Sequence, residues 1–308
     1  MRDAANSNVA SFVEPVRYLS YLVSHCALTL ARPSLFQEPG HSISEVDGRL
    51  GDDGDVEDPL LSAHKLIKFY LISSGDCVNS MAPLLHDEYP NFIGSAALAR
   101  SAVEHSSRSM YVSAPSISHH ARVLRTLALV KGSLKQYKST NDANATELID
   151  KWDRWKTRID RSTAEFRGVP KQSLGNPTTL IEKAFPVDGA RSYEELSRPV
   201  HGNAVWMIST VIQEQKETAV ARIMLMRNAM FAIRCVMSAT ESAADLWGLD
   251  LDLVVNTVAR QDGSGILSRW QEKTWGDLVA ATGDLSEIVS SFDEAQFVDA
   301  TTDVQPTR

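Results

Sequence analysis

The stretch IMLMRNAMFAIRCVM, at residues 223–237, decides the fold that we expect for this chain. Its apolar residues fall on nearly every side of a helix instead of along one stripe, which is typical of a helix that is buried all round. The stretch belongs to a longer helical pattern over residues 217–247. We therefore expect this helix to lie at the centre of the molecule, covered by the elements before and after it.

The flanking sequence predicts further helices that cover this central one. Apolar residues recur every three or four positions over residues 11–30, and Pro59 can open a helix that continues to residue 81. The same reasoning predicts helices over residues 92–112, 118–137, 145–166 and 199–212, with shorter ones between residues 251 and 292. Only 16 glycines and 12 prolines occur among 308 residues, which disfavours a β-rich fold. The expected fold class is all-α, a single-core bundle of about eight or nine helices.

The negative charge of the chain is concentrated in one segment. Eight acidic residues and a single arginine lie between Gln37 and Asp58, so this segment carries nearly all of the net charge of −8. It mixes glycine, proline and serine with little helical periodicity, which predicts a flexible loop. The expected organisation is an N-terminal helix at residues 1–31, an acidic flexible loop at 32–58, a main helical domain at 59–298 and a tail at 299–308.

Composition and motifs disfavour several classes of function. The three cysteines lie far apart and form no metal-binding pair, and the acids of the loop do not follow the spacing of a calcium-binding loop. Phosphate-loop, hydrolase-elbow, zinc-protease and dinucleotide-binding motifs do not occur. We therefore expect no metal and no cofactor. Without a long apolar run or a secretory signal pattern at the N-terminus, we also expect a cytoplasmic protein with no membrane partner.

Arg100, Glu104 and Arg108 carry the first chemical signal. They follow each other at i, i+4 spacing on the helix expected over residues 92–112, so a carboxylate lies between two guanidinium groups on one face. Their neighbours on this helix are mostly alanine and serine, which leaves room for a ligand or a second helix. One interpretation makes the arginines anion clamps, and the other makes the three residues an ion-pair ladder in solvent.

The second signal is the stretch YEELSRPVHGN at residues 193–203, directly before a strongly apolar segment. If Pro199 starts a helix, Ser197 lies near its N-cap and His201 in its first turn. A neutral imidazole there could transfer protons, because histidine titrates near physiological pH. A purely structural histidine is the alternative.

These two stretches resemble motifs of uncharacterised bacterial all-helical families, some of which are loosely similar to HEPN domains. Such families carry an aliphatic-Arg-Ser-x-x-Glu helix, matched by residues 99–104, and a later Tyr-x-x-Leu-Ser-x-x-x-His-Gly turn, matched by residues 193–202. The resemblance covers residues 60–213 and implies that the two stretches meet in space. The residues that it places around one site are Arg100, Glu104, Tyr193, Ser197 and His201.

HEPN ribonucleases use an arginine and a histidine four to six residues apart, and Arg100 and His105 have this spacing. Ser101 stands where those enzymes usually have asparagine, aspartate or histidine. On a helix His105 points about 100° away from Glu104, so a site that uses His105 differs from the ladder of Arg100, Glu104 and Arg108.

Three functions follow as hypotheses. The first is binding of a small polar or anionic organic ligand in a pocket lined by arginine, glutamate and histidine, with turnover of that ligand left open. The second is a HEPN-like, metal-independent ribonuclease of the toxin or defence type that acts as a homodimer; the nearly neutral body otherwise offers nucleic acid little attraction, and RNA is the one nucleic acid left open as a partner. The third is a regulatory protein whose acidic loop docks on a basic partner. The candidate catalytic residues are Glu104, His201 and His105, and the candidate ligand-binding residues are Arg100, Arg108, Tyr193, Ser197 and Asn203.

Overall fold

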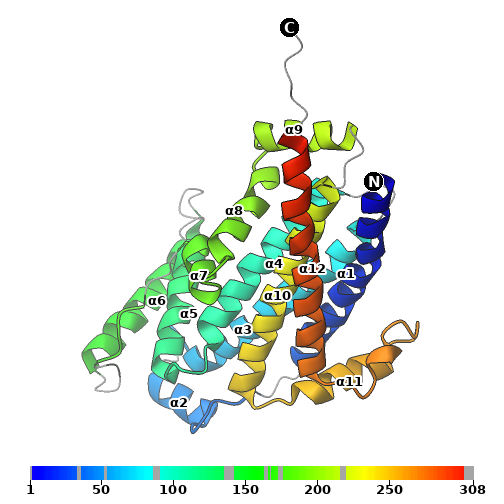
Figure 1. Cartoon of the computed structure of the whole chain (residues 1–308). Coiled ribbons are helices and arrows are strands. Elements are labelled where there is room, and N and C mark those ends of the chain that lie inside the picture. The colour runs from blue at the N-terminus through cyan, green and yellow to red at the C-terminus, as the bar shows by residue number, and fades with distance from the viewer. Residues whose placement is uncertain are drawn as a thin grey trace.

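The computed structural model describes residues 2–32, 36–51, 54–85, 91–134, 142–162, 166, 168–172, 176–215 and 220–301. Within these ranges the regular secondary structure is entirely helical, which confirms the all-α prediction (Figure 1). Twelve α-helices occur there: α1 (Arg2–Leu30), α2 (Ile43–Leu50), α3 (Pro59–Met81), α4 (Phe92–Ser113), α5 (His119–Leu134), α6 (Ala143–Ser162), α7 (Pro177–Ala184), α8 (Gly189–Val200), α9 (Ala204–Gln215), α10 (Val220–Trp247), α11 (Leu251–Gln261) and α12 (Trp275–Thr301). Short 3₁₀ helices at Ala82–Leu84 and Ser268–Trp270 follow α3 and α11, respectively.

The core of the bundle is formed by α1, α3, α4 and α10, which make the most extensive contacts with one another. Ile223, Met226, Ile233 and Val236 of α10 are buried, as expected for a helix that is apolar nearly all round. The buried face of α4 consists largely of alanine and serine, which lets α3 and α10 approach its backbone closely. Figure 1 shows α10 running along α4 with α12 in front, and α1 and α12 reaching the same end of the molecule.

The predicted number of eight or nine helices is too low, because short helices escaped the periodicity. Helices α2 and α7 have eight residues each, only about two turns, and lie in segments rich in glycine and proline. Their N-caps are clear in the structure. Ser42 accepts a hydrogen bond from the backbone N–H of Glu45 (3.4 Å), and Asn176 accepts one from that of Thr179 (2.8 Å).

The acidic segment contains helix α2 and is not the flexible loop predicted for residues 32–58. Val46 and Leu50 of α2 are buried in a cluster with Leu60 and Trp155, and the indole of Trp155 donates a hydrogen bond to the carbonyl oxygen of Leu50 (2.8 Å). The four-residue spacing of Val46 and Leu50 gives α2 its apolar face, which the surrounding acids obscured. Residues 33–35 and 52–53 lie outside the described residues.

The C-terminal end also differs from expectation. Helix α12 continues to Thr301, two residues beyond the start of the tail predicted for 299–308, and residues 302–308 lie outside the described residues. No helix in the described ranges combines the length and the apolar character needed to cross a membrane.

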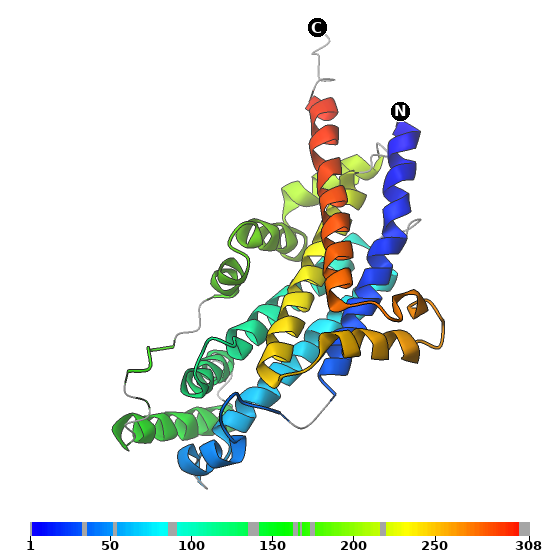
Figure 2. The same cartoon turned by 60° about the horizontal axis from the view of Figure 1, so that its bottom comes forward.

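The helix expected from Pro199 is divided in two. Pro199 lies in the last turn of α8, and Gly202, with φ +63°, supplies the left-handed conformation that turns the chain into α9. Asn203 caps α9, its side-chain oxygen accepting from the N–H of Trp206 (3.0 Å). A proline near either end of a helix gives the same local signal, so the sequence did not distinguish a start at Pro199 from an end. Figures 1 and 2 show the outcome: α9 crosses one end of the bundle, while α2 and α6 lie at the other.

Candidate functional site

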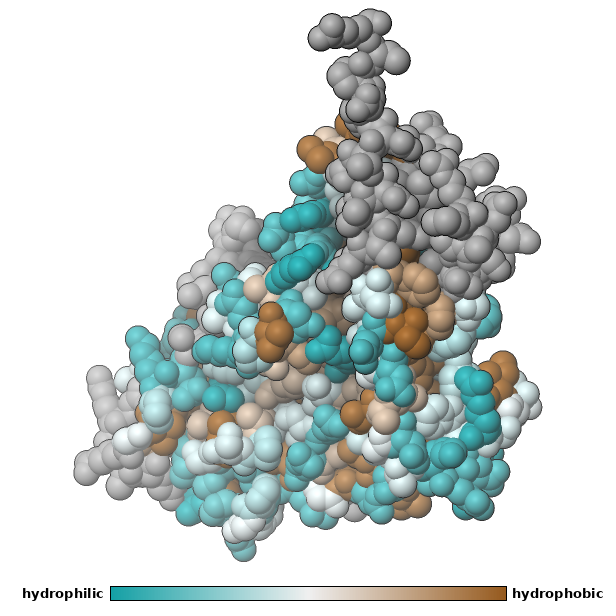
Figure 3. All heavy atoms as spheres, in the orientation of Figure 1, coloured by the Kyte–Doolittle hydropathy of each residue, from teal (hydrophilic) through white to brown (hydrophobic). Residues whose placement is uncertain are grey.

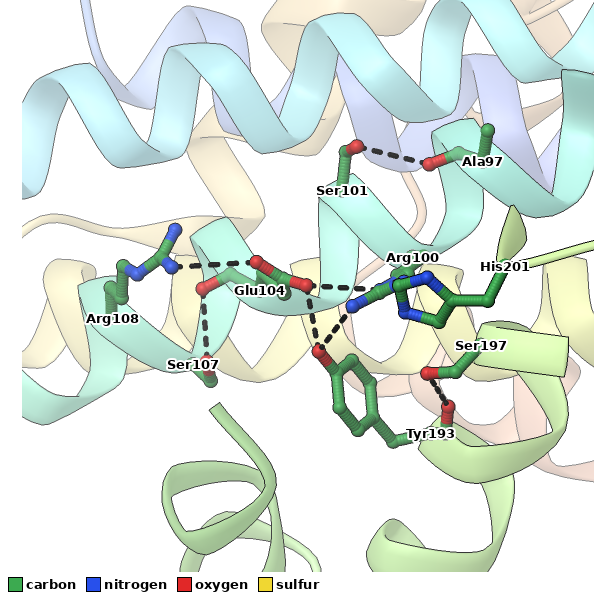
Figure 4. Close-up of polar contacts among 9 residues, drawn as sticks. All are labelled: Ala97, Arg100, Ser101, Glu104, Ser107, Arg108, Tyr193, Ser197 and His201. Carbon is green, nitrogen blue, oxygen red and sulfur yellow. Dashed lines mark hydrogen bonds and ion pairs between the residues drawn. The ribbon is translucent and has the colours of Figure 1, made fainter. Parts of the chain in front are cut away.

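The candidate site lies where α8 packs along α4, and five of the predicted residues meet there (Figure 4). Asn91 is the N-cap of helix α4, and its side-chain oxygen accepts from the N–H of Gly94 (2.8 Å). The alanine and serine residues of α4 pack against α3 and α10, and the side chains of Arg100 and Glu104 reach Tyr193 of α8. We call the group that they form with α8 the α4–α8 cluster; its members are Arg100, Glu104, Arg108, Tyr193 and His201.

Glu104 is the centre of the cluster. Its Oε1 accepts hydrogen bonds from Nε of Arg100 (3.1 Å) and from the hydroxyl of Tyr193 (2.7 Å), and its Oε2 accepts from Nη2 of Arg108 (3.4 Å). The side chains of Arg100, Glu104 and Arg108 are 19%, 21% and 27% exposed, so the group is partly shielded from water. The ladder predicted from the i, i+4 spacing is therefore packed against a second helix and is not an isolated row in solvent.

His201 joins the cluster through Arg100. Nη1 of Arg100 lies 2.7 Å from Nε2 of His201, and Nη2 of the same guanidinium donates to the hydroxyl oxygen of Tyr193 (3.3 Å). A guanidinium can only donate, so Nε2 of His201 is the acceptor; the imidazole in this arrangement is neutral and carries its proton on Nδ1. His201 is exposed, whereas the side chain of Arg100 is largely buried.

The surroundings of the cluster change the acidity of two of its members. Burial lowers the pKa of Arg100, but the hydrogen bond from its guanidinium to Tyr193 and the charge of Glu104 outweigh burial and raise it on balance. Burial raises the pKa of Tyr193, and its hydrogen bond to the Glu104 carboxylate raises it further. Arg100 is therefore held as a cation and Tyr193 as a neutral phenol.

Ser197 and Asn203 follow Tyr193 along the chain, but their side chains form hydrogen bonds with backbone groups. The hydroxyl of Ser197 donates to the carbonyl oxygen of Tyr193 (2.8 Å), and Asn203 caps α9. Ser197 is thus inside α8 and is not the N-cap that the sequence suggested. Figure 4 shows its hydroxyl turned toward its own helix.

His105 lies apart from the cluster. Its ring stacks on Tyr70 of α3 (centroids 5.9 Å apart), whereas Arg100 and Glu104 face α8. Burial lowers the pKa of His105, and the positive charge of Arg108 lowers it further. Its buried Nδ1 has no hydrogen-bond partner within the described ranges. The spacing of Arg100 and His105 therefore does not bring these two side chains to one face.

Sequence reasoning missed a second polar group, buried between α3, α5 and the acidic segment. Oε2 of Glu38 lies 3.1 Å from Nε2 of His64 and accepts from Nε of Arg122 (3.0 Å), while the indole N–H of Trp247 donates to Nδ1 of His64 (3.0 Å). Arg122 also donates to the carbonyl oxygen of Val112. The available signal was Arg122, which lies among apolar residues such as Val123 and Leu127 on a predicted helix. An arginine that is buried there needs an acidic partner.

No set of three or more histidine, cysteine, aspartate or glutamate side chains in the described part of the chain is arranged to hold a metal ion. The candidate site is therefore defined by its hydrogen bonds and charges. Comparison of the chain with protein-family models, with curated proteins and with solved structures finds no match.

Proposed function

We propose that the α4–α8 cluster binds a small anionic organic ligand, with Arg100 and Arg108 as clamps and His201 as a third donor. The observation that carries this proposal is an excess of hydrogen-bond donors over acceptors in the cluster. Both oxygens of Glu104, the oxygen of Tyr193 and Nε2 of His201 already accept hydrogen bonds. The cluster also combines two guanidinium charges with a single carboxylate, which leaves one positive charge for a ligand to balance.

The donors that remain indicate the chemistry of the ligand. Arg108 has five N–H groups, of which the contact with Glu104 uses one, and His201 has its Nδ1–H. Guanidinium groups bind carboxylates and phosphates through paired hydrogen bonds, so a carboxylate or phosphate group suits this arrangement. Glu104 would hold the two guanidinium groups in position. His201, exposed beside them, can offer its Nδ1–H to the ligand as a hydrogen-bond donor.

Native mass spectrometry of the purified full chain tests the proposal. We expect a ligand mass that survives gentle ionisation, disappears under denaturing conditions and is lost in the Arg100→Ala variant. Arg198→Ala is the matched control, because Arg198 lies on α8, the second helix of the site, but pairs with Glu194 (3.0 Å) outside the cluster. Ligand binding that is unchanged in both Arg100→Ala and Glu104→Ala would overturn the proposal.

The two other hypotheses have less support from the geometry. The ribonuclease hypothesis needs Arg100 and His105 at one site, and His105 packs against Tyr70 on α3. Its test is loss of RNA cleavage in a folded His105→Ala variant. The regulatory hypothesis needs a free acidic loop, and α2 packs within that segment.

A further inference from the structure

Helix α9 exposes apolar side chains that the bundle leaves uncovered. Val205, Ile208 and Ile212 are 75%, 59% and 41% exposed, although isoleucine and valine are among the residues most often buried. Figure 3 shows brown, apolar atoms at the end of the molecule where α9 crosses the bundle in Figure 1.

The opposite side of α9 already serves to attach the helix. Trp206 and Thr210, four residues apart, line a small cavity with Phe92 of α4 and Met224 of α10. Val205, Ile208 and Ile212 fall on the other side of the helix at 3.6 residues per turn. Helix α9 thus has an inner face that packs on the bundle and an outer face, defined by Val205, Ile208 and Ile212, that is free for a partner.

The spacing of the outer face fits another helix. Steps of three and then four residues separate Val205, Ile208 and Ile212, which is the repeat of helices that pair along one seam. In an antiparallel pair of identical helices, Val205 of each copy would lie opposite Ile212 of the other, with Ile208 near the two-fold axis. The stripe is therefore complementary to itself.

Charge indicates which partner covers this face. Residues 200–212 contain no aspartate, glutamate, lysine or arginine, while the whole chain carries −8. Helices that lie on membranes usually present lysine or arginine to anionic headgroups, and α9 has neither. Like charges of two copies repel each other mainly where the acidic segment lies, and along residues 200–212 two copies can meet without bringing charged side chains together.

We propose that two copies of the chain associate through the outer faces of their α9 helices, paired antiparallel about a two-fold axis. This inference is independent of ligand binding at the α4–α8 cluster. It requires only that the uncharged stripe of one copy meets the same stripe of the second.

Sedimentation equilibrium of the full chain over a range of protein concentrations tests this inference. We expect a monomer–dimer equilibrium for the wild-type chain and at least about 100-fold weaker association for Ile208→Glu, because two carboxylates then meet near the axis. The matched control is Leu253→Glu, which places a charge at a comparably exposed apolar residue (66%) on α11 and should leave association unchanged. Circular dichroism of Ile208→Glu checks that the exposed substitution leaves the fold intact.

Two outcomes would overturn the inference. One is a wild-type chain that stays monomeric at every concentration, including the case in which it binds vesicles of phosphatidylcholine and phosphatidylserine instead. The other is a dimer that Ile208→Glu weakens no more than Leu253→Glu does.

Discussion

At the residue scale, the phenol of Tyr193 links the two helices of the candidate site. It donates to Glu104 and accepts from Arg100, so Tyr193→Phe removes two contacts while keeping the packing of the ring. We expect this variant to lower the free energy of unfolding by about 1–2 kcal/mol, since both former partners are partly buried. Urea denaturation measures the loss.

Tyr21→Phe is the control for this substitution. Tyr21 lies on α1 and is half-buried, and no hydrogen bond of its hydroxyl is found within the described residues. Its removal should change the free energy of unfolding by less than about 0.5 kcal/mol. Equal effects of the two substitutions would mean that Tyr193 does not hold the cluster together.

A group of three neighbouring histidines predicts that the stability of the protein depends on pH. The ring of His119 lies against those of His41 and His120 (centroids 4.2 and 3.9 Å apart). Burial, His120 and His41 lower the pKa of His119 from 6.5 to about 4; Glu38 opposes this shift and Arg49 adds to it. Between pH 6.5 and 4 the unfolded chain therefore binds the proton more readily than the folded chain does.

The contribution of His119 to stability is complete above pH 6.5 and is lost as the pH falls toward 4. We expect it to remove about 3 kcal/mol from the free energy of unfolding over this window. Urea denaturation at a series of pH values should show a shallower decline in His119→Phe than in the wild-type chain. Parallel profiles would contradict the role assigned to His119.

The candidate site was more predictable than the rest of the polar structure, because part of it is local. The i, i+4 spacing of Arg100, Glu104 and Arg108 along one helix predicts that their side chains lie together. Their meeting with Tyr193 and His201 was expected only from a resemblance, since no local rule links residues that are 89 and 101 positions apart. The pair of Glu38 and Arg122, 84 positions apart, had no such guide and was missed.

At the element scale, the start of α3 depends on a carboxylate from another helix. Asp47 of α2 accepts hydrogen bonds from the backbone N–H groups of Leu60 (2.6 Å) and Leu61 (3.0 Å). Asp58, at the N-cap position itself, makes no side-chain capping bond. Asp47 therefore does the work of a cap and also fastens α2 to α3.

Asp47→Ala should cost about 1–2 kcal/mol in the free energy of unfolding, whereas Asp58→Ala should cost less than about 0.5 kcal/mol. Thermal unfolding of the two variants followed by circular dichroism measures both. A larger effect of Asp58→Ala would show that α3 is capped by its sequence neighbour after all.

Long helices were predictable because their caps and periodicity agree. Helix α3 occupies the predicted residues 59–81, with Pro59 in its first turn. The short helices α2 and α7 were not predictable, since two turns contain too few apolar residues to reveal a buried face of the helix. The α8–α9 junction depends on the conformation of Gly202, which the residues around Pro199 do not specify.

At the scale of the whole molecule, the buried carboxylate of Glu38 ties the acidic segment to the bundle, in addition to Asp47. Burial raises the pKa of Glu38, but its contacts with His64 and Arg122 outweigh burial and lower it, so Glu38 is held ionised. The side chain of Arg122 is 1% exposed. Glu38→Gln would leave this guanidinium buried without a carboxylate and should cost about 3–5 kcal/mol in the free energy of unfolding.

Glu45→Gln is the matched control, because Glu45 is an exposed acid of the same segment. Its effect should stay below about 0.5 kcal/mol when both variants are compared by urea denaturation. Similar small effects would mean that the segment is held mainly by α2 and not by the buried ion pair. The same reasoning predicts that deletion of residues 37–58 destabilises the bundle.

The most direct test of the central claim is calorimetric titration of the full chain with inorganic phosphate and with acetate, the simplest carriers of the two anionic groups. We expect saturable binding of at least one of them, weakened at least tenfold in Arg100→Ala, or about 1.4 kcal/mol, and unchanged in Arg198→Ala. Equal affinities in the wild-type chain and Arg100→Ala, or no binding of either anion by the wild-type chain, would contradict the assignment of the α4–α8 cluster as an anion site.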